Sequence, residues 1–281
     1  MSDTARRHQL RDEMLHTAEK ETLLMGILNT TPDSFSDGGE FVTTDRALEQ
    51  AETLFADGAD IIDIGGESTR PGAVPVSEED ERMRTLELVS ILFDRGVGPI
   101  SIDTYKAAIA RDAAAAGAVL INDVWGMTRD DNMAATVAAT QSAVVITYNR
   151  GEADPTVDII DDMHQFFQRA FETARSVGIP NEHIWLDPGV GFSKTLEQNF
   201  EVLRRLDVVQ SFDRPVLVGL SRKSIIGLTL DQPVDQRLAG TLGAHLAALQ
   251  RGARILRVHD VREHADAIKM FNLIQNGDCD G

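Results

Sequence analysis

The stretch DRALEQAETLFADGADIIDIGG, residues 45–66, contains a helix-forming segment followed by a strand-forming segment. In residues 45–59 apolar side chains recur at spacings of three and four, and the segment ends near a glycine, which is typical of an amphipathic helix. The run DIIDIGG at 60–66 is short and rich in isoleucine, which predicts a strand buried on both faces. The stretch is therefore one unit of an α/β fold.

Seven further runs rich in Ile, Val and Leu occur along the chain. They are LLMGILN at 23–29, PISIDT at 99–104, VLINDV at 119–124, AVVITYN at 143–149, IWLDPGV at 184–190, PVLVGLS at 215–221 and ILRVHD at 255–260. Helical stretches such as AGTLGAHLAALQRGA at 239–253 separate most of them, which predicts parallel pairing. Eight such units in 281 residues fit a single-domain (βα)8 TIM barrel better than an open doubly wound sheet, since no Gly-rich G-x-G-x-x-G turn follows the first run.

The chain shows no Pro-, Gly- or Ser-rich linker that would divide this barrel. We expect residues 1–20 to form an N-terminal extension, with a helix that closes the bottom of the barrel, residues 21–275 to form the barrel, and residues 276–281 to form a C-terminal tail.

Composition excludes several classes of function. A net charge of −18 argues against a general nucleic-acid surface, because phosphate backbones are bound by clustered Lys and Arg. No apolar run is long enough to span a membrane and the N-terminus is polar, so we expect a cytoplasmic protein without membrane contact. Cys279 is the only cysteine, which rules out an internal disulfide and a cysteine-rich metal site.

Against this acidic background, cationic side chains stand at or just after the ends of several strands: Arg70, Arg222, Lys223, Arg257 and His259. Local cations of this kind indicate a small anionic ligand rather than a polymer.

Polar side chains also end the predicted strands, and a barrel places its catalytic groups at the carboxyl ends of strands. Asp103, Asn122 and Asp187 are short and rich in acceptors, which suits the edge of a flat heterocycle bearing N–H donors. Lys223 can donate to a ring carbonyl or nitrogen. Arg257 and His259 lie two positions apart on the last strand, so their side chains point to the same side. Together they would hold an anionic group such as pyrophosphate.

Two loops follow the first two strands. The segments NTTPDSFSDGG at 29–39 and GGESTRPGA at 65–73 are rich in Gly, Ser and Thr, and we expect them to close over a substrate. Glu67 is expected to brace the second loop.

Seven motifs, in chain order, resemble the dihydropteroate synthase family, the folate-pathway enzymes that sulfonamides target. The motifs are MGILNTTPDSFSDGG, GADIIDIGGESTRPGA, SIDTYK, INDVWG, LDPGVGF, GLSRKS and LRVHDV. The resemblance covers residues 22–270, and the ordered series is far more specific than any single motif. It implies a pterin-binding TIM barrel, and a homodimer.

The resemblance also implies a transferase reaction in folate biosynthesis, with magnesium as cofactor. In it, 6-hydroxymethyl-7,8-dihydropterin pyrophosphate and p-aminobenzoate give 7,8-dihydropteroate and pyrophosphate. Pyrophosphate departure is the difficult step, and it resembles dissociation to a pterin-stabilised cation. Positioning and electrostatics would supply most of the catalysis.

The residues that match the family's motifs take on roles by this resemblance. The pterin would be held by Asp103, Asn122, Asp187 and Lys223. The pyrophosphate would be held by Asn29, Arg257 and His259, with Asn29 also reaching magnesium. The aminobenzoate would be framed by Thr69, Arg70, Pro71, Phe192, Lys223 and Ser224, and Asp33 and Phe35 lie in the closing loop. The catalytic set would be Asp33, Arg70, Lys223, Arg257 and His259.

One motif departs from the family. After the fifth strand this chain reads ITYNRG, so Thr147 and Tyr148 stand where the family usually has a Met-His pair. The Met commonly lines the pterin pocket, and we expect stacking by Tyr148 to replace part of that contact. The expected consequence is altered affinity rather than lost activity.

Each of these residues also has a purely structural interpretation. Asp103 and Asp187 can cap helices, and the cations of SRKS can be a solvated helix start. The acidic run SEEDER at 77–82 is expected to be a solvated helix start. His245, in an Ala-Leu stripe, is expected to pack within a helix interface or on a dimer face and not in a ligand site.

Three alternative functions remain on sequence grounds. A methyltransferase that uses methyltetrahydrofolate would not need Arg257, His259 and the STRPG loop together. A Schiff-base aldolase would use Lys223 as its nucleophile, which borohydride trapping would reveal. A barrel that binds pterin without condensing it has only the change at residues 147 and 148 in its favour.

Overall fold

The computed structural model describes residues 1–30, 40–68 and 74–276. Within them the eight predicted strands form one parallel sheet. They are β1 (Leu23–Asn29), β2 (Ile61–Gly65), β3 (Ile100–Asp103), β4 (Leu120–Asp123), β5 (Ala143–Thr147), β6 (Ile184–Asp187), β7 (Leu217–Val218) and β8 (Ile255–Val258). β1 pairs with both β2 and β8, and a single bridge between Leu186 and Val216 joins β6 to the start of β7. The sheet therefore closes into the expected barrel.

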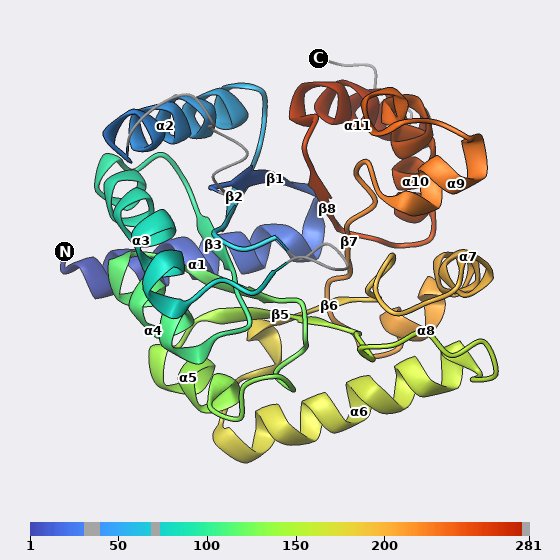
Figure 1. The fold of residues 1–281 in the computed structure, drawn as a ribbon, viewed down its shortest axis with the longest axis horizontal. Helices are drawn as coiled ribbons and strands as arrows, with labels where there is room; N and C mark the ends of the chain where they lie inside the picture. Colours follow the sequence, from blue (N-terminus) through green and yellow to red (C-terminus); the bar gives the residue numbers. More distant parts are fainter. Residues whose placement is uncertain (31–39, 69–73, 277–281) are drawn as a thin grey trace.

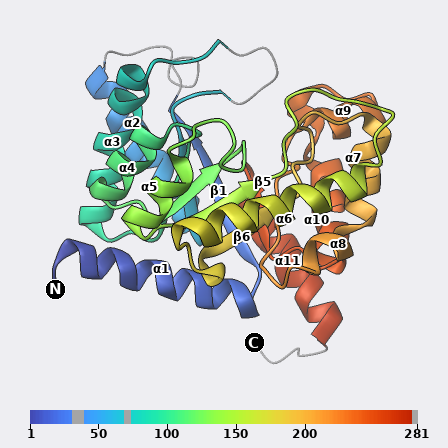
Figure 2. The ribbon, with the colours of Figure 1, turned by 90° about the horizontal axis from the view of Figure 1, so that it is seen from below.

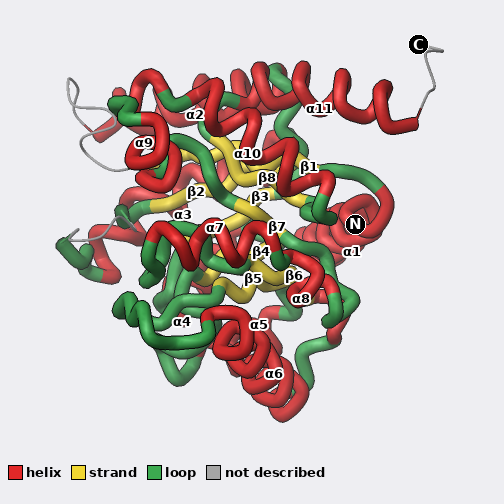
Figure 3. The backbone as a smooth tube through the Cα atoms, turned by 90° about the vertical axis from the view of Figure 1, so that its right-hand side faces the viewer, coloured by secondary structure: helices red, strands yellow, loops and turns green. Residues whose placement is uncertain are grey.

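Helices surround this barrel (Figures 1 and 3). They are α1 (Asp3–Lys20), α2 (Glu40–Ala56), α3 (Glu78–Arg95), α4 (Ala107–Ala116), α5 (Met133–Thr140), α6 (Ile159–Val177), α7 (Leu196–Arg204), α8 (Leu206–Gln210), α9 (Ser224–Leu230), α10 (Leu238–Gln250) and α11 (Val261–Asn276), with short 3-10 turns at Asn181–His183 and Val234–Gln236. None of the helices in the described ranges is long and apolar enough to cross a membrane.

The start of α3 shows how local sequence sets a helix boundary. The Ser77 side chain caps it by accepting from the Asp80 amide, and acidic residues fill the first turn, where they meet the positive end of the helix dipole. The run at 77–82 is thus a helix start, as predicted. It is not solvated throughout, because Glu81 is only 1% exposed and its Oε2 pairs with Lys106 Nζ at 2.5 Å.

The first helix lies across one end of the barrel (Figure 2). Met14, Leu15 and Ala18 of α1 join an apolar cluster inside the barrel. Arg7 donates to the carbonyl oxygens of Ala118 and Thr140 and to the Ser142 hydroxyl. These groups immediately precede β4 and β5, so α1 covers the amino-terminal ends of the strands.

The barrel interior has two levels. Because side chains alternate along a strand, every second residue of each strand points inward. Near α1 these residues are apolar and belong to one cluster: Leu23, Met25, Ile61, Leu120, Val145, Trp185, Leu217 and Ile255. Two positions further along, toward the carboxyl ends, the inward residues include Asp63, Asn122, Thr147, Asp187 and Arg257. Most polar inward side chains therefore lie toward one end of the barrel.

The contacts of α1 lead to a stability prediction. Arg7→Met should lower the free energy of unfolding by about 2–3 kcal/mol, because buried acceptors lose charge-assisted hydrogen bonds. Urea denaturation measures this loss. Gln9→Met, at an exposed position of the same helix, is the control and should change stability by less than about 0.5 kcal/mol. Equal stability of the two variants would show that α1 is not docked through Arg7.

Candidate active site

Arg257 on β8 lies at the centre of the polar end of the barrel, between two carboxylates. Its Nε donates to Asp63 Oδ2 at 2.6 Å and its Nη2 donates to Asp103 Oδ2 at 2.7 Å. Asn122 Nδ2 donates to the same Asp63 oxygen at 2.9 Å. Four strands, β2, β3, β4 and β8, therefore contribute one side chain each to a single hydrogen-bonded cluster, which we call the Arg257 cluster.

The Arg257 cluster contains more negative than positive charge. Asp63 is completely buried and Asp103 is 5% exposed, yet they share one guanidinium. Burial raises the pKa of Asp103 to about 7, the attraction of Arg257 opposes this rise, and the charge of Asp63 adds to it.

Two carboxylate oxygens of this cluster, Asp63 Oδ1 and Asp103 Oδ1, are buried without a hydrogen-bond partner among the described residues. Buried acceptors are normally paired. A ligand with several N–H donors would satisfy them.

Asp187 and Lys223 form the opposite wall. Asp187 Oδ1 accepts from the Gly189 amide at 2.7 Å. Gly189 has φ of +66°, and a Cβ there would come within 2.0 Å of the Tyr148 carbonyl oxygen, so only glycine allows this close turn. Burial raises the pKa of Asp187, and the attraction of Lys223 opposes this effect.

Lys223 lies at the N-cap of α9, with its ammonium directed toward the loop after β6. Its Nζ donates to the Val190 carbonyl at 2.6 Å and lies 4.5 Å from the centre of the Phe192 ring. Burial lowers the pKa of Lys223 to about 8, against the attraction of Asp187. A lysine in this state can still donate a proton in a hydrogen bond at neutral pH.

The other predicted residues of the described ranges lie around these two walls. A Cβ built on Gly65 would meet Asp103 and the Asn29 amide oxygen, at 3.5 and 3.8 Å, so Asn29 flanks the Arg257 cluster at the end of β1. His259 follows β8, and its backbone amide donates to Ser221 Oγ at 3.1 Å. Ser224 begins α9 and is exposed.

Several predicted residues lie outside the described residues: Asp33, Phe35, Thr69, Arg70, Pro71 and Cys279. Arg222 is described, and its guanidinium is paired with Asp260 rather than directed at the barrel mouth. Glu67 braces its loop as predicted, because its carboxylate accepts from Lys106 Nζ at 2.5 Å and from Tyr105 OH at 3.0 Å.

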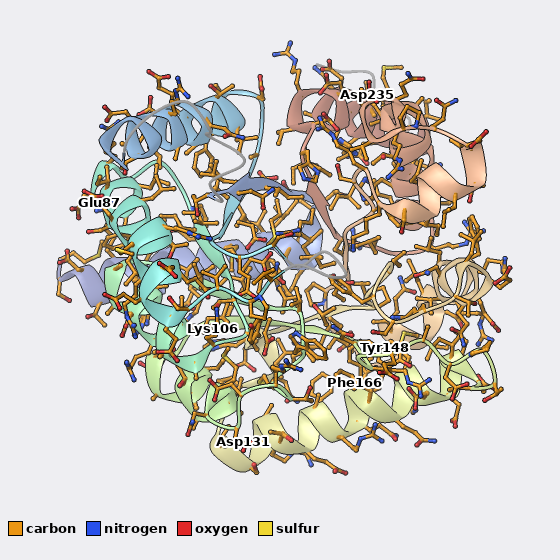
Figure 4. All side chains as sticks on the ribbon, in the orientation of Figure 1. Glu87, Lys106, Asp131, Tyr148, Phe166 and Asp235 are labelled. Carbon is orange, nitrogen blue, oxygen red and sulfur yellow. The ribbon has the colours of Figure 1, made fainter. Side chains whose placement is uncertain are left out.

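The expectation that Tyr148 stacks in the ligand pocket is wrong. Tyr148 points out of the barrel toward α6, where it lies edge-on to Phe166 and its hydroxyl donates to Asp162 at 2.5 Å (Figure 4). The alternation along β5 places Thr147 inward instead, in register with Asp187. Thr147 Oγ1 is buried and has no hydrogen-bond partner in the described part of the chain.

Sequence reasoning missed three residues of this region: Asp63, the inward role of Thr147, and Lys194. Lys194 Nζ donates to the carbonyls of Gly189 and Phe192 at 2.9 and 3.1 Å. These two hydrogen bonds stabilise the loop after β6. Burial lowers the pKa of Lys194 to about 7. A signal for Asp63 was present, since an aspartate in the middle of a strand buried on both faces must have a polar partner.

The described residues contain no group of three or more His, Cys, Asp or Glu side chains that could hold a metal ion. Magnesium usually takes only one or two protein ligands and completes its shell with substrate phosphates and water. The Asn29 amide oxygen at the barrel mouth fits a magnesium ion that arrives with a phosphorylated substrate, and does not fit a resident metal held by protein alone.

Comparison with known proteins agrees with this geometry. A family described as "Pterin binding enzyme" matches residues 25–259. The chain belongs to the pterin-binding enzyme family. Dihydropteroate synthase of Bacillus subtilis (strain 168) is 44% identical over 259 residues, which cover 92% of this chain and 90% of the relative. The Synechocystis enzyme of the same name is 45% identical over 262 residues, 91% of each chain.

Solved structures of this family share the fold closely. Dihydropteroate synthase from Clostridium difficile, solved in the presence of pteroic acid, superposes with a TM-score of 0.88 at 44% identity, covering 91% of this chain and 97% of the other. The Xanthomonas albilineans enzyme with 4-aminobenzoic acid gives 0.87 at 41% identity, with 92% and 94% covered. The pterin-binding barrel expected from the motif series is thereby confirmed.

Asp63 is the member of the Arg257 cluster that the sequence did not predict, and its contact with Arg257 leads to a stability prediction. Asp63→Asn removes one charge-assisted partner of Arg257, so it should lower the free energy of unfolding by about 1.5–3 kcal/mol, as measured by urea denaturation. Asp213→Asn changes a carboxylate that is fully exposed, so it is the matched control and should be neutral to within about 0.5 kcal/mol. If Asp63→Asn were as stable as the control, Asp63 would not be holding Arg257.

Proposed function

We infer that the chain has dihydropteroate synthase activity and condenses 6-hydroxymethyl-7,8-dihydropterin pyrophosphate with p-aminobenzoate. One observation carries the inference: buried acceptors on one wall and a lysine on the other converge at the carboxyl ends of the strands. Relatives named dihydropteroate synthase match about nine-tenths of the chain. Solved relatives were determined in the presence of pteroic acid and with 4-aminobenzoic acid.

The Arg257 cluster and Asp187 would bind the pterin ring. The ring bears amino and N–H donors, which the free oxygens of Asp63 and Asp103 and the carboxylate of Asp187 can accept. Asn122 is held by Asp63 and keeps its amide oxygen for a ring donor. The Thr147 hydroxyl adds a polar group where most relatives have a thioether, and we expect it to alter ring affinity without abolishing turnover.

The leaving group would lie at the rim. Asn29, His259 and the outer edge of Arg257 would bind the pyrophosphate, and Asn29 would contribute one oxygen to magnesium. That ion would neutralise charge on the departing group when bound. Because the carboxylates lie deeper than the rim, the binding site separates the acceptors for the ring from the groups that bind the anion.

Lys223, Ser224 and Phe192 would frame the p-aminobenzoate, together with Thr69, Arg70 and Pro71. The Phe192 ring and the Lys223 stem give an apolar surface for a flat aromatic acid, and the Lys223 ammonium can reach either the pterin or the second substrate. Asp33, in the loop that follows the first strand, would be a further catalytic residue.

The reaction then needs little proton transfer by the protein. The bond between the pterin methylene carbon and the pyrophosphate oxygen breaks, and its electron pair leaves with pyrophosphate. The amine lone pair forms the new C–N bond, and the amine nitrogen loses one proton to solvent. An aromatic amine is already neutral at cellular pH, so the residues contribute mainly alignment and stabilisation of separated charge.

We also propose that the chain acts in the cytoplasm as a homodimer. Family resemblance supports the homodimer, and Leu228, Leu230 and Val234 provide exposed apolar side chains that suit self-association. Light scattering would test the homodimer, and a monomer at micromolar concentration would contradict it.

The activity is tested by product formation. With magnesium present, the chain should convert the two substrates to dihydropteroate and pyrophosphate. Asp187→Asn should lower kcat/KM by about a hundredfold or more through loss of a ring acceptor, whereas the exposed Asp207→Asn should leave it unchanged. Tight pterin binding without product would indicate a non-condensing relative, and absence of both would refute the inferred activity.

The raised pKa of Asp103 predicts proton release on ring binding. Ring N–H donors favour the ionised carboxylate, so binding lowers a pKa that is about 7 in the free protein. At about pH 6 the bound carboxyl loses a proton that the free one keeps, and at about pH 8.5 it is ionised in both states.

Calorimetry in buffers with different ionisation enthalpies measures this release. 6-Hydroxymethylpterin is the ligand of choice, because it lacks a pyrophosphate that titrates in the same range. Release at the lower pH should disappear in Asp103→Asn. Equal release at both pH values would contradict the assignment.

A further inference from the structure

Two buried histidines connect the loops that follow β7 and β8. His245 of α10 and His264 of α11 are 0% and 1% exposed. His245 Nε2 accepts from the Leu220 amide at 3.0 Å, and His245 Nδ1 lies 2.9 Å from His264 Nε2. His264 Nδ1 lies 2.6 Å from the Asp260 carbonyl oxygen. Complete burial excludes the expected alternative that His245 lies on a dimer face.

The Leu220 amide gives these three hydrogen bonds one consistent direction. The Leu220 amide can only donate, so His245 Nε2 is unprotonated and its Nδ1 carries the hydrogen. His245 Nδ1–H then donates to His264 Nε2, which leaves His264 Nδ1–H to donate to the Asp260 carbonyl. All four ring nitrogens are used while both rings are neutral, so the chain from Leu220 to Asp260 has no spare donor or acceptor.

The two ends of this histidine relay lie next to predicted site residues. Leu220 precedes Lys223 by three residues, and the Lys223 amide donates back to the Leu220 carbonyl at 3.1 Å. Asp260 directly follows His259. Two more contacts join the same loops, between Ser221 and His259 and between Arg222 and Asp260. Among the described residues, the relay is the only one of these three connections that passes through the core beneath the loops.

We propose that His245 and His264 are positioning residues that hold Lys223 and His259 in register with each other, through Leu220 and Asp260. The proposal rests on the inferred synthase activity, because it concerns the alignment of a ring contact with a leaving-group contact. Neither histidine touches substrate in this scheme. Loss of the relay misaligns the two loops while the barrel stays folded.

The relay should also respond to pH. A proton added at His245 Nε2 would face the Leu220 amide, and one added at His264 Nε2 would face His245 Nδ1–H. Burial holds the pKa of both rings below the ordinary value; Lys223 also lowers that of His245, while the nearby Val218 carbonyl opposes the effect. For His264, the Asp260 carbonyl, Asp260 and Glu263 oppose burial. Acid therefore breaks a relay that is intact at neutral pH.

The test compares four variants with the wild-type chain. His245→Phe keeps a ring and removes both nitrogens, and His264→Phe breaks the outer half. His245→Gln restores an acceptor for the Leu220 amide. His16→Gln changes an exposed histidine of α1 and is the control. We measure kcat and KM for both substrates, hydrogen exchange of segments 217–224 and 256–263, and urea stability.

We expect both Phe variants to lower kcat by about tenfold or more, with smaller changes in KM, because slight misplacement of aligned groups mainly affects the transition state. Exchange in both segments should accelerate, and His245→Gln should recover kcat to within about threefold of wild type. The ratio of wild-type to His245→Phe kcat should keep its full value across neutral pH, because burial keeps both rings neutral there.

Other outcomes overturn one inference or the other. Variants that lose stability but keep wild-type kcat and segment exchange would show that the histidines only fill the core. A ratio close to one at neutral pH would equally exclude the relay. If the wild-type chain gives no product, the synthase activity fails, and unchanged exchange in the two segments would then reject the positioning role separately.

Discussion

The interaction on which the site depends is the sharing of one guanidinium, that of Arg257, by two buried carboxylates. Asp63 and Asp103 come from neighbouring strands, and Arg257 lies between them and donates to both. Removing that cation would raise the pKa of Asp103 further, because the attraction of Arg257 is what opposes the effect of burial. The arrangement costs stability and is retained because it presents acceptors that an apolar interior cannot provide. Its two unpartnered carboxylate oxygens suit the proposed binding of a ring with N–H donors.

The barrel makes this charge tolerable by separating it from the rest of the core. Inward residues near α1 are mostly apolar, and polar ones begin one step further along several strands, as with Ile61 and Asp63 or Leu120 and Asn122. The alternation of side chains that places apolar residues in the barrel near α1 therefore also places the polar site residues at its mouth. Small residues then let the larger groups converge: a Cβ at Gly219 would lie 3.6 Å from Arg257 Cβ and 3.9 Å from Lys223 Nζ.

The sequence alone predicted the eight strands, the closed barrel and the strand ends that carry Asp103, Asn122, Asp187, Lys223 and Arg257, because buried parallel strands have a strong local signature. It failed where the answer depends on which way a side chain points. Tyr148 was expected in the pocket, but strand alternation turns it toward α6 and turns Thr147 inward. Asp63 and the relay of His245 and His264 depend on partners about 20 to 190 residues away in the chain, and no local pattern reports such contacts.

Two of the proposed catalytic residues, Lys223 and His259, belong to loops and not to strands of the barrel. The proposed acceptors of the ring belong to strands, and the hydrogen-bonded register of the sheet fixes their positions. Lys223 and His259 lie just beyond strand ends, where backbone hydrogen bonding of the sheet no longer constrains them. Side-chain contacts must replace it, and Ser221, Asp260 and the two histidines provide these contacts between β7 and β8. A rigid ring site beside loops held by side chains suits a reaction in which the ring stays bound while its anionic substituent leaves.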